Sequence, residues 1–140
     1  MNKSYRDLVA WQKAMDLVTA IYQITSSFPQ EELYGLTSQL RRAAVSVPSN
    51  IAEGQGRRGA AEFKHFLRQA SGSLMELETQ MMIAERLRYV TPESAGRVLE
   101  RSAEVGRILN GLINSFGARK LTTDYWLLAT GVSYVEIIDS

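Results

Sequence analysis

The stretch SVPSNIAEG, residues 46–54, places a proline and an asparagine in the middle of an apolar helical pattern. The apolar register that leads up to Pro48 continues unchanged beyond it, through Leu36, Leu40, Val47 and Ile51. A helix that restarted at Pro48 would be free to change its phase. We therefore expect one helix, kinked at Pro48, that ends between Gly54 and Gly59. Two short helices with Ser46 as a cap are the alternative.

An amphipathic segment precedes this helix. Its wide apolar face is expected to be buried and comprises Leu8, Trp11, Ala14, Met15, Leu17, Val18, Ile21, Tyr22, Ile24 and Thr25. The segment should end near Ser26, because Phe28 precedes a proline and is disfavoured in the helical region. The sequence PQEE, residues 29–32, then indicates a helix start at Pro29.

Two more amphipathic segments follow. The third helix is expected to bury Phe63, Phe66 or Leu67, Ala70, Leu74, Leu77, Met81, Ala84 and Leu87. Its Gly72 weakens the helix and could permit another helix to approach closely. The fourth helix is predicted to start at TPES, with Thr91 as N-cap and Pro92 in the first turn, and to stop at Gly117.

Four long amphipathic helices joined by short connections predict an all-α protein, an antiparallel up-and-down four-helix bundle over residues 1–117. After Lys120 the sequence becomes apolar and nearly uncharged. Residues 118–140 are therefore expected to form a C-terminal tail of uncertain structure or an arm that docks on its own or a neighbouring subunit.

The composition excludes several classes of protein. A chain of 140 residues with 45% hydrophobic residues can bury a core as one domain. The absence of cysteine excludes disulfide frameworks, cysteine nucleophiles and the usual zinc-finger ligand sets. No apolar run is long enough to span a membrane, so we expect a cytoplasmic protein. The net charge of +1 gives no whole-protein reason to expect nucleic acid.

One short motif bears on metal chemistry. EFKH, residues 62–65, matches the Glu-x-x-His step of carboxylate di-iron bundles. His65 is the only histidine and lies off the apolar stripe, so we expect it to be solvated, with no metal and no cofactor. A small-ligand or metal-binding bundle that uses Glu53, Glu62 and Glu76 is the alternative function. Since no nucleophile or phosphate cradle accompanies these acids, no catalytic residue and no enzyme activity are expected.

Polar side chains run beside the apolar stripes of the second and third helices. They are Gln39, Arg42, Ser46, Asn50, Glu53 and Arg57 on the second, and Glu62, Gln69, Ser73, Glu76 and Gln80 on the third. These stripes are either solvated faces or a hydrogen-bonded seam between helices or subunits. Asn50 supplies both donors and acceptors, and could satisfy backbone groups that Pro48 frees.

Two adjacent arginine pairs are the candidates for nucleic-acid binding. The residues that could contact phosphates are Arg41, Arg42, Arg57, Arg58, Lys64 and Arg68. Together with Arg86 and Arg88 they could form a basic strip. Ordinary surface charge is the alternative. The glycine-flanked pair in GQGRRG is not a Walker motif.

Three stretches carry a resemblance to a known family: DLVAWQKA (7–14), FPQEELYGLTSQLRRAAVSVPSNIAEGQGR (28–57) and EFKHFLRQASGSLMELE (62–78). Over about residues 5–117 the chain resembles small bacterial four-helix-bundle proteins described as 23S rRNA-intervening-sequence proteins, and their relative, the accessory variability protein of diversity-generating retroelements. The signature residues are Ser46, Pro48, Asn50, Glu53 and Gly54.

The resemblance has implications for assembly and partners. It implies a ring-like homopentamer without enzyme activity, and the retroelement relatives bind nucleic acid through a basic surface. The partners it implies are further copies of this chain, RNA or DNA, or a nucleic-acid-processing protein.

Overall fold

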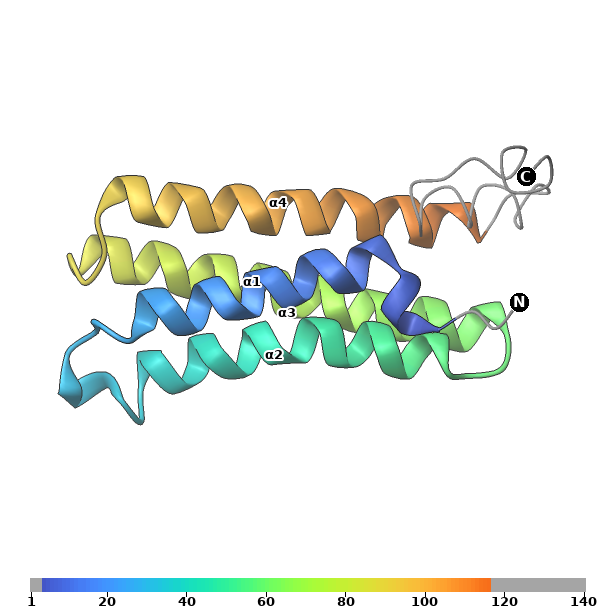
Figure 1. Cartoon of the computed structure of the whole chain (residues 1–140), viewed down its shortest axis with the longest axis horizontal. Coiled ribbons are helices and arrows are strands. Elements are labelled where there is room, and N and C mark those ends of the chain that lie inside the picture. The colour runs from blue at the N-terminus through green and yellow to red at the C-terminus, as the bar shows by residue number, and fades with distance from the viewer. Residues whose placement is uncertain (1–3, 117–140) are drawn as a thin grey trace.

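The computed structural model of the chain describes residues 4–116, which fold into helices with no strand among them. The elements are η1 (Tyr5–Asp7), α1 (Val9–Thr25), η2 (Gln30–Glu32), α2 (Leu36–Gln55), α3 (Ala60–Arg86) and α4 (Pro92–Ser115), the two η elements being 3₁₀ turns. In Figure 1 the four α-helices lie side by side, and consecutive helices run in opposite directions. The predicted all-α four-helix bundle is confirmed. The predictions for residues 118–140 lie outside the described residues.

The core lies along the bundle axis, where each helix packs against two neighbours. The largest buried side chains are leucines, isoleucines, valines and one methionine, namely Leu17, Ile21, Leu40, Val47, Ile51, Leu67, Leu77, Met81, Val105, Leu109 and Leu112. Burying one such side chain stabilises the fold by about 1.5–3 kcal/mol. Alanines at Ala14, Ala44, Ala70 and Ala84 are also fully buried, which lets the helices approach closely.

Helix α2 continues through Pro48, as the unbroken apolar register predicted. Val47 and Ile51 are both fully buried, so the alternative of two short helices is wrong. Asn50 Nδ2 donates to the carbonyl oxygen of Ser46 at 2.8 Å. The carbonyl that loses its helical donor at Pro48 is that of Ala44, four residues earlier. Asn50 therefore does not satisfy the group that the proline frees, and the bend at Pro48 stays a prediction.

The start of α2 differs from the prediction. Residues 30–32 form only the 3₁₀ turn η2, and α2 begins at Leu36 rather than at Pro29. Glu32 causes this difference, because its Oε1 accepts a hydrogen bond from the backbone N–H of Leu36 at 3.1 Å. Gly35 has φ −114° and ψ −114°, outside the helical region, and separates the two elements.

Other helix ends follow the sequence signals. α1 ends at Thr25, next to the expected Ser26. Thr91 caps α4 as predicted, since its side chain accepts from the backbone N–H of Ser94 at 3.2 Å. α4 ends at Ser115, and the predicted stop at Gly117 lies outside the described residues.

Three residues predicted for the core are exposed, while Trp11, Val18 and Ile24 are partly buried against it. Met15, Tyr22 and Leu87 expose between two-fifths and one-half of their surface. The prediction about Gly72 is also wrong, because a Cβ there would meet no atom within 4 Å. The glycine at a close helix approach is Gly54, where a Cβ would lie 2.7 Å from Cβ of Phe66 on α3.

Candidate functional site

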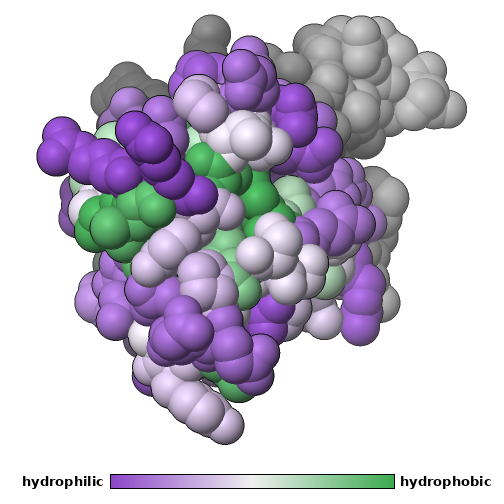
Figure 2. All heavy atoms as spheres, turned by 90° about the vertical axis from the view of Figure 1, so that its left-hand side faces the viewer, coloured by the Kyte–Doolittle hydropathy of each residue, from purple (hydrophilic) through white to green (hydrophobic). Residues whose placement is uncertain are grey.

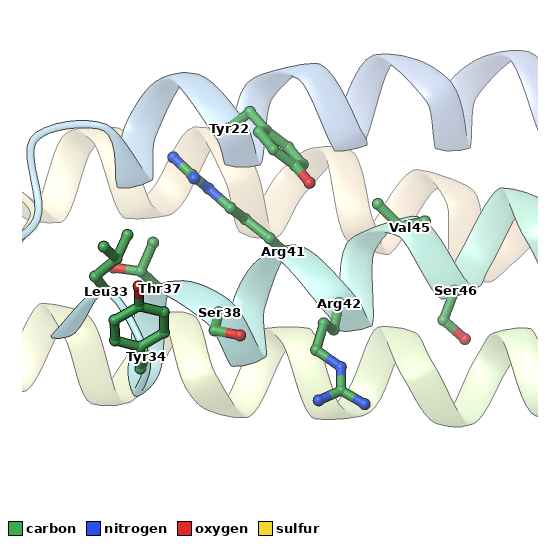
Figure 3. A pocket seen from close by; sticks show the side chains of 9 residues that line it. All are labelled: Tyr22, Leu33, Tyr34, Thr37, Ser38, Arg41, Arg42, Val45 and Ser46. Carbon is green, nitrogen blue, oxygen red and sulfur yellow. The ribbon is translucent and has the colours of Figure 1, made fainter.

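A groove runs along the outer side of α1 and α2 and reaches the η2 turn. Its volume is about 720 Å³. We call it the α1–α2 groove; it is lined by Tyr22, Leu33, Tyr34, Thr37, Ser38, Arg41, Arg42, Val45 and Ser46. In Figure 3 α1 supplies Tyr22 from above, while the other residues come from α2 and from the short segment before it.

Arg41 forms a fixed wall of this groove. Its Nε donates to Oγ1 of the buried Thr25 at 2.9 Å, and Thr25 donates in turn to the carbonyl oxygen of Ile21 at 2.6 Å. The guanidinium carbon lies 4.6 Å from the ring centroid of Tyr22, a cation–π contact. Figure 3 shows Arg41 reaching toward α1 and Arg42 pointing the other way. Arg41 thus holds α1 against α2 and keeps a positive charge in the groove.

Glu32 anchors the chain segment at the η2 end of the groove. Its Oε2 accepts a hydrogen bond from the hydroxyl of Tyr89 at 2.9 Å, while its Oε1 accepts from the N–H of Leu36. The ring of Phe28 packs against that of Tyr89, with centroids 5.6 Å apart. The hydrogen bond to Glu32, together with desolvation and the negative charge, raises the pKa of Tyr89. These contacts fix the segment whose next two residues, Leu33 and Tyr34, line the groove.

The groove is rich in exposed aromatic and aliphatic surface. Tyr34 is 93% exposed, and Tyr22, Leu33 and Val45 are each at least 40% exposed. Figure 2, which faces the end of the bundle that carries η2, shows apolar surface among hydrophilic side chains. Apolar side chains that gather on one surface and are held in place mark an interaction site. Sequence reasoning missed this site because it assigned Tyr22 to the core and did not single out Tyr34.

The polar stripes of α2 and α3 meet in part as a seam between these two helices. The hydroxyls of Ser46 and Ser73 lie 2.8 Å apart, and Asn50 Nδ2 donates to Ser46 Oγ at 2.9 Å. Further along, Gln80 Nε2 lies 3.5 Å from Gln39 Oε1, at the limit of a hydrogen bond. The hydrogen-bonded interpretation therefore fits these residues.

Other members of the stripes are solvated. Glu53 and Arg57 form an exposed ion pair at 3.1 Å. Arg42 and Glu76 are exposed as well. The stripe of α2 is thus a hydrogen-bonded seam at Gln39, Ser46 and Asn50, whereas Arg42, Glu53 and Arg57 are solvated.

The predicted basic residues do not form one strip. Arg57 and Arg58 are exposed at the connection between α2 and α3, with the guanidinium carbon of Arg57 5.1 Å from the ring centroid of Phe66. Arg42 precedes Gln55, the last residue of α2, by 13 residues, which is about 20 Å along the helix. Arg42 is therefore well separated from Arg57 and Arg58 beyond the end of α2, and Arg41 faces α1 instead.

Lys64 and Arg68 lie on another side of α3. They precede Ser71 and Met75 by seven residues each, a spacing that keeps residues on one helix face. Ser71 and Met75 line a hollow of about 200 Å³ with Gly106 of α4. Lys64 and Arg68 are thus placed on the side of α3 that faces α4, away from the arginines of α2.

The residues of the alternative metal-binding function are also dispersed. Among residues 4–116, no three histidine, cysteine or acidic side chains lie close enough together to hold a metal ion. Glu62 and Glu76 are 14 residues apart, about 21 Å along α3, while Glu53 is paired with Arg57. His65 is exposed, as predicted, with its Nε2 3.1 Å from Nε2 of Gln69. None of the helices described is both long and apolar enough to cross a membrane.

Comparisons with known proteins establish the family. The model of the 23S rRNA-intervening sequence protein family matches residues 6–111, and the chain belongs to this family. A crystal structure from the S23 ribosomal protein family of Bacteroides thetaiotaomicron, a protein with unknown function, is 22% identical and superposes with a TM-score of 0.68. That match covers 75% of this chain and 98% of the other. None of the curated proteins matches the chain. The relation to the retroelement accessory protein stays a prediction.

Proposed function

We propose that the chain is a non-catalytic cytoplasmic subunit of a closed homo-oligomer whose copies associate through the α1–α2 groove. One observation carries this proposal. Tyr22, Leu33, Tyr34 and Val45 expose aromatic and aliphatic surface on one groove whose walls are fixed by hydrogen bonds. A monomer gains nothing from holding such side chains in solvent, whereas an interface gains from anchors that are already in position.

The size of the exposed surface favours a ring over an isolated pair. Covering the four side chains would contribute roughly 4–8 kcal/mol, since three of them are already partly buried. Association costs about 4–15 kcal/mol in lost translational and rotational freedom. One such contact is therefore weak, and closing a ring adds a further contact without a new association cost. The number five comes from the family resemblance.

The experiment is size-exclusion chromatography with light scattering at micromolar concentration. The wild-type chain should have about five times the 15.7 kDa chain mass, and Tyr34→Glu should have the mass of a single chain. Met75→Glu is the matched control, because Met75 is 62% exposed on α3 and away from the groove. Its mass should equal that of the wild type. A monomeric wild type, or equal masses for the two variants, would refute the proposal.

A second candidate function is nucleic-acid binding through Arg42, Arg57 and Arg58. All three are exposed, and the connection between α2 and α3 carries two of them side by side. The description of the family, an intervening sequence of 23S rRNA, supports an RNA partner. A ring would repeat these arginines around its axis, so that modest contacts add by avidity.

Salt titration tests this second function. Structured RNA, single-stranded RNA and duplex DNA are offered to the wild type and to a double variant with serine at Arg57 and Arg58. Arg41 and Arg42 are kept because both line the α1–α2 groove. Each phosphate contact that is lost should flatten the log–log slope on duplex DNA by about 0.9. Arg107→Ser, an exposed arginine on α4, is the control. No binding at low salt, or equal slopes, would remove this candidate.

A further inference from the structure

We infer that the α1–α2 groove binds the C-terminal segment, residues 121–140, of the neighbouring copy. This inference rests on the proposed function and names the occupant of the same groove. The segment reads LTTDYWLLATGVSYVEIIDS. It combines aromatic and aliphatic residues, which match the apolar lining of the groove, with acidic residues, which the lining lacks.

The charges of the two parts are complementary. Residues 121–140 contain three acidic residues, Asp124, Glu136 and Asp139, and no lysine or arginine. The 120 residues before them contain all sixteen basic residues and twelve acidic ones. Within the groove the charged side chains are those of Arg41 and Arg42. The acidic segment is therefore attracted to the positively charged groove. The same charges favour one orientation of the segment within the groove.

The apolar chemistry is complementary as well. Two tyrosines, a leucine and a valine of the groove are exposed in the residues described. The segment supplies ten apolar or aromatic residues of the size that fills such grooves, namely Leu121, Tyr125, Trp126, Leu127, Leu128, Val132, Tyr134, Val135, Ile137 and Ile138. Aromatic anchors contribute most to binding when a preformed groove receives them. Covering both surfaces at once removes two apolar patches from water.

The position of the groove along the bundle favours exchange between copies. The ion pair between Lys13 Nζ and Glu104 Oε1, at 2.9 Å, fixes the register of α1 against α4. Because α1 and α4 run in opposite directions, Tyr22 lies level with position 95 of α4. Position 95 precedes Ser115, the last residue of α4, by 20 residues, which is about 30 Å along the helix. Figure 1 shows α4 ending at one end of the bundle and η2 lying at the other.

This arrangement generates a ring without a second type of interface. A segment that leaves one end of a copy and binds a groove toward the other end of the next makes a heterologous contact. Heterologous contacts related by a rotation that closes generate rings. The contact between two copies is weak when the groove residues alone contribute to it. The 20 residues of the segment add buried area to this contact and strengthen it.

A fluorescence measurement on the full chain tests where the segment lies. The chain contains only two tryptophans, Trp11 and Trp126. In a Trp11→Phe chain, emission therefore reports on Trp126 alone. At micromolar concentration Trp126 should emit in the blue-shifted range of a buried indole and resist acrylamide. Adding Tyr34→Glu should shift the emission to the red, whereas adding Met75→Glu should not. An exposed Trp126 in the oligomer would overturn the inference.

A mixing experiment distinguishes a neighbouring copy from the same chain. Tyr34→Glu damages the groove, and the double variant Trp126→Asp with Leu127→Asp damages the segment. Each protein alone should have the mass of a single chain. A mixture should form one-to-one pairs, because one protein supplies an intact groove and the other an intact segment, and no ring can grow from them. If no pairs form in the mixture, although Trp126 is buried in the Trp11→Phe chain, the segment binds its own chain and the inference is wrong.

The same set of proteins separates this inference from the proposed function. A segment variant that keeps the full mass, while Tyr34→Glu dissociates, overturns the inference and leaves association through the groove intact. A wild type with the mass of one chain overturns the proposed function, and with it the neighbouring copy as partner. As a charge test, Arg42→Glu should weaken association several-fold, and Glu136→Arg with Asp139→Arg should restore it. A failure to restore would contradict the charge argument.

Discussion

Replacing Gly54 with alanine tests the closest approach of α2 to α3. A Cβ at this buried position would lie 2.7 Å from Cβ of Phe66, 3.0 Å from Cδ1 of Phe63 and 3.3 Å from the carbonyl oxygen of Phe63. Rotating the Phe66 side chain cannot move its Cβ, and the carbonyl belongs to the backbone of α3. The two helices would therefore have to separate by several tenths of an ångström.

Two opposing effects set the magnitude. Overpacking of this kind costs about 1–3 kcal/mol of folding free energy. Alanine is favoured over glycine in a helix interior by up to about 1 kcal/mol. The clash involves backbone and Cβ atoms and so exceeds the propensity gain. We expect Gly54→Ala to lower the free energy of unfolding by about 1–2 kcal/mol.

Gly72→Ala is the matched control, because Gly72 also lies inside a helix and a Cβ there meets no atom within 4 Å. It should raise the free energy of unfolding by about 0.5–1 kcal/mol. Both variants are unfolded with urea at one fixed protein concentration and followed by circular dichroism, since association would otherwise shift the midpoint. A Gly54→Ala protein as stable as the wild type would refute the argument from close approach.

Three further predictions concern the seam and the anchor of the groove. Asn50→Ala should lower the free energy of unfolding by about 0.5–1.5 kcal/mol, because it removes both hydrogen bonds to Ser46; a change within urea-titration error would show that Asn50 is merely solvated. Tyr89→Phe should release η2 and speed amide hydrogen exchange at Leu36, whose N–H bonds to Glu32, and unchanged exchange would exclude that anchor. The pKa of Tyr89 is raised above 10.0, so the folded state holds this proton more tightly than the unfolded state; the free energy of unfolding should fall as pH rises through that raised pKa, and a Tyr89→Phe protein with the same decline would refute the assignment.

Local sequence signals predicted the helices and several of their ends. The unbroken register across Pro48 indicated one continuous helix, and Thr91 with Pro92 marked the start of α4. Both signals depend on residues close together in the chain, where periodicity and capping chemistry are sufficient. Such features can be read without knowledge of the partner helix.

Features that depend on distant residues could not be predicted in this way. The start of α2 is set by Glu32, which also bonds to Tyr89, 57 residues away. Gly54 and Gly72 look alike in sequence, yet only Gly54 meets another helix. Periodicity marked Tyr22 as apolar but not whether a neighbouring helix covers it, so the α1–α2 groove was missed.

The labelling rate of a single cysteine in the groove tests the central claim most directly. The chain has no cysteine, so Ser38→Cys places one thiol in the groove, and Ala103→Cys places one on the exposed side of α4. If copies associate through the groove, the rate at which a maleimide labels Ser38→Cys should fall as the protein concentration rises. The rate for Ala103→Cys should stay constant. Labelling of Ser38→Cys at a rate independent of protein concentration would contradict association through the groove.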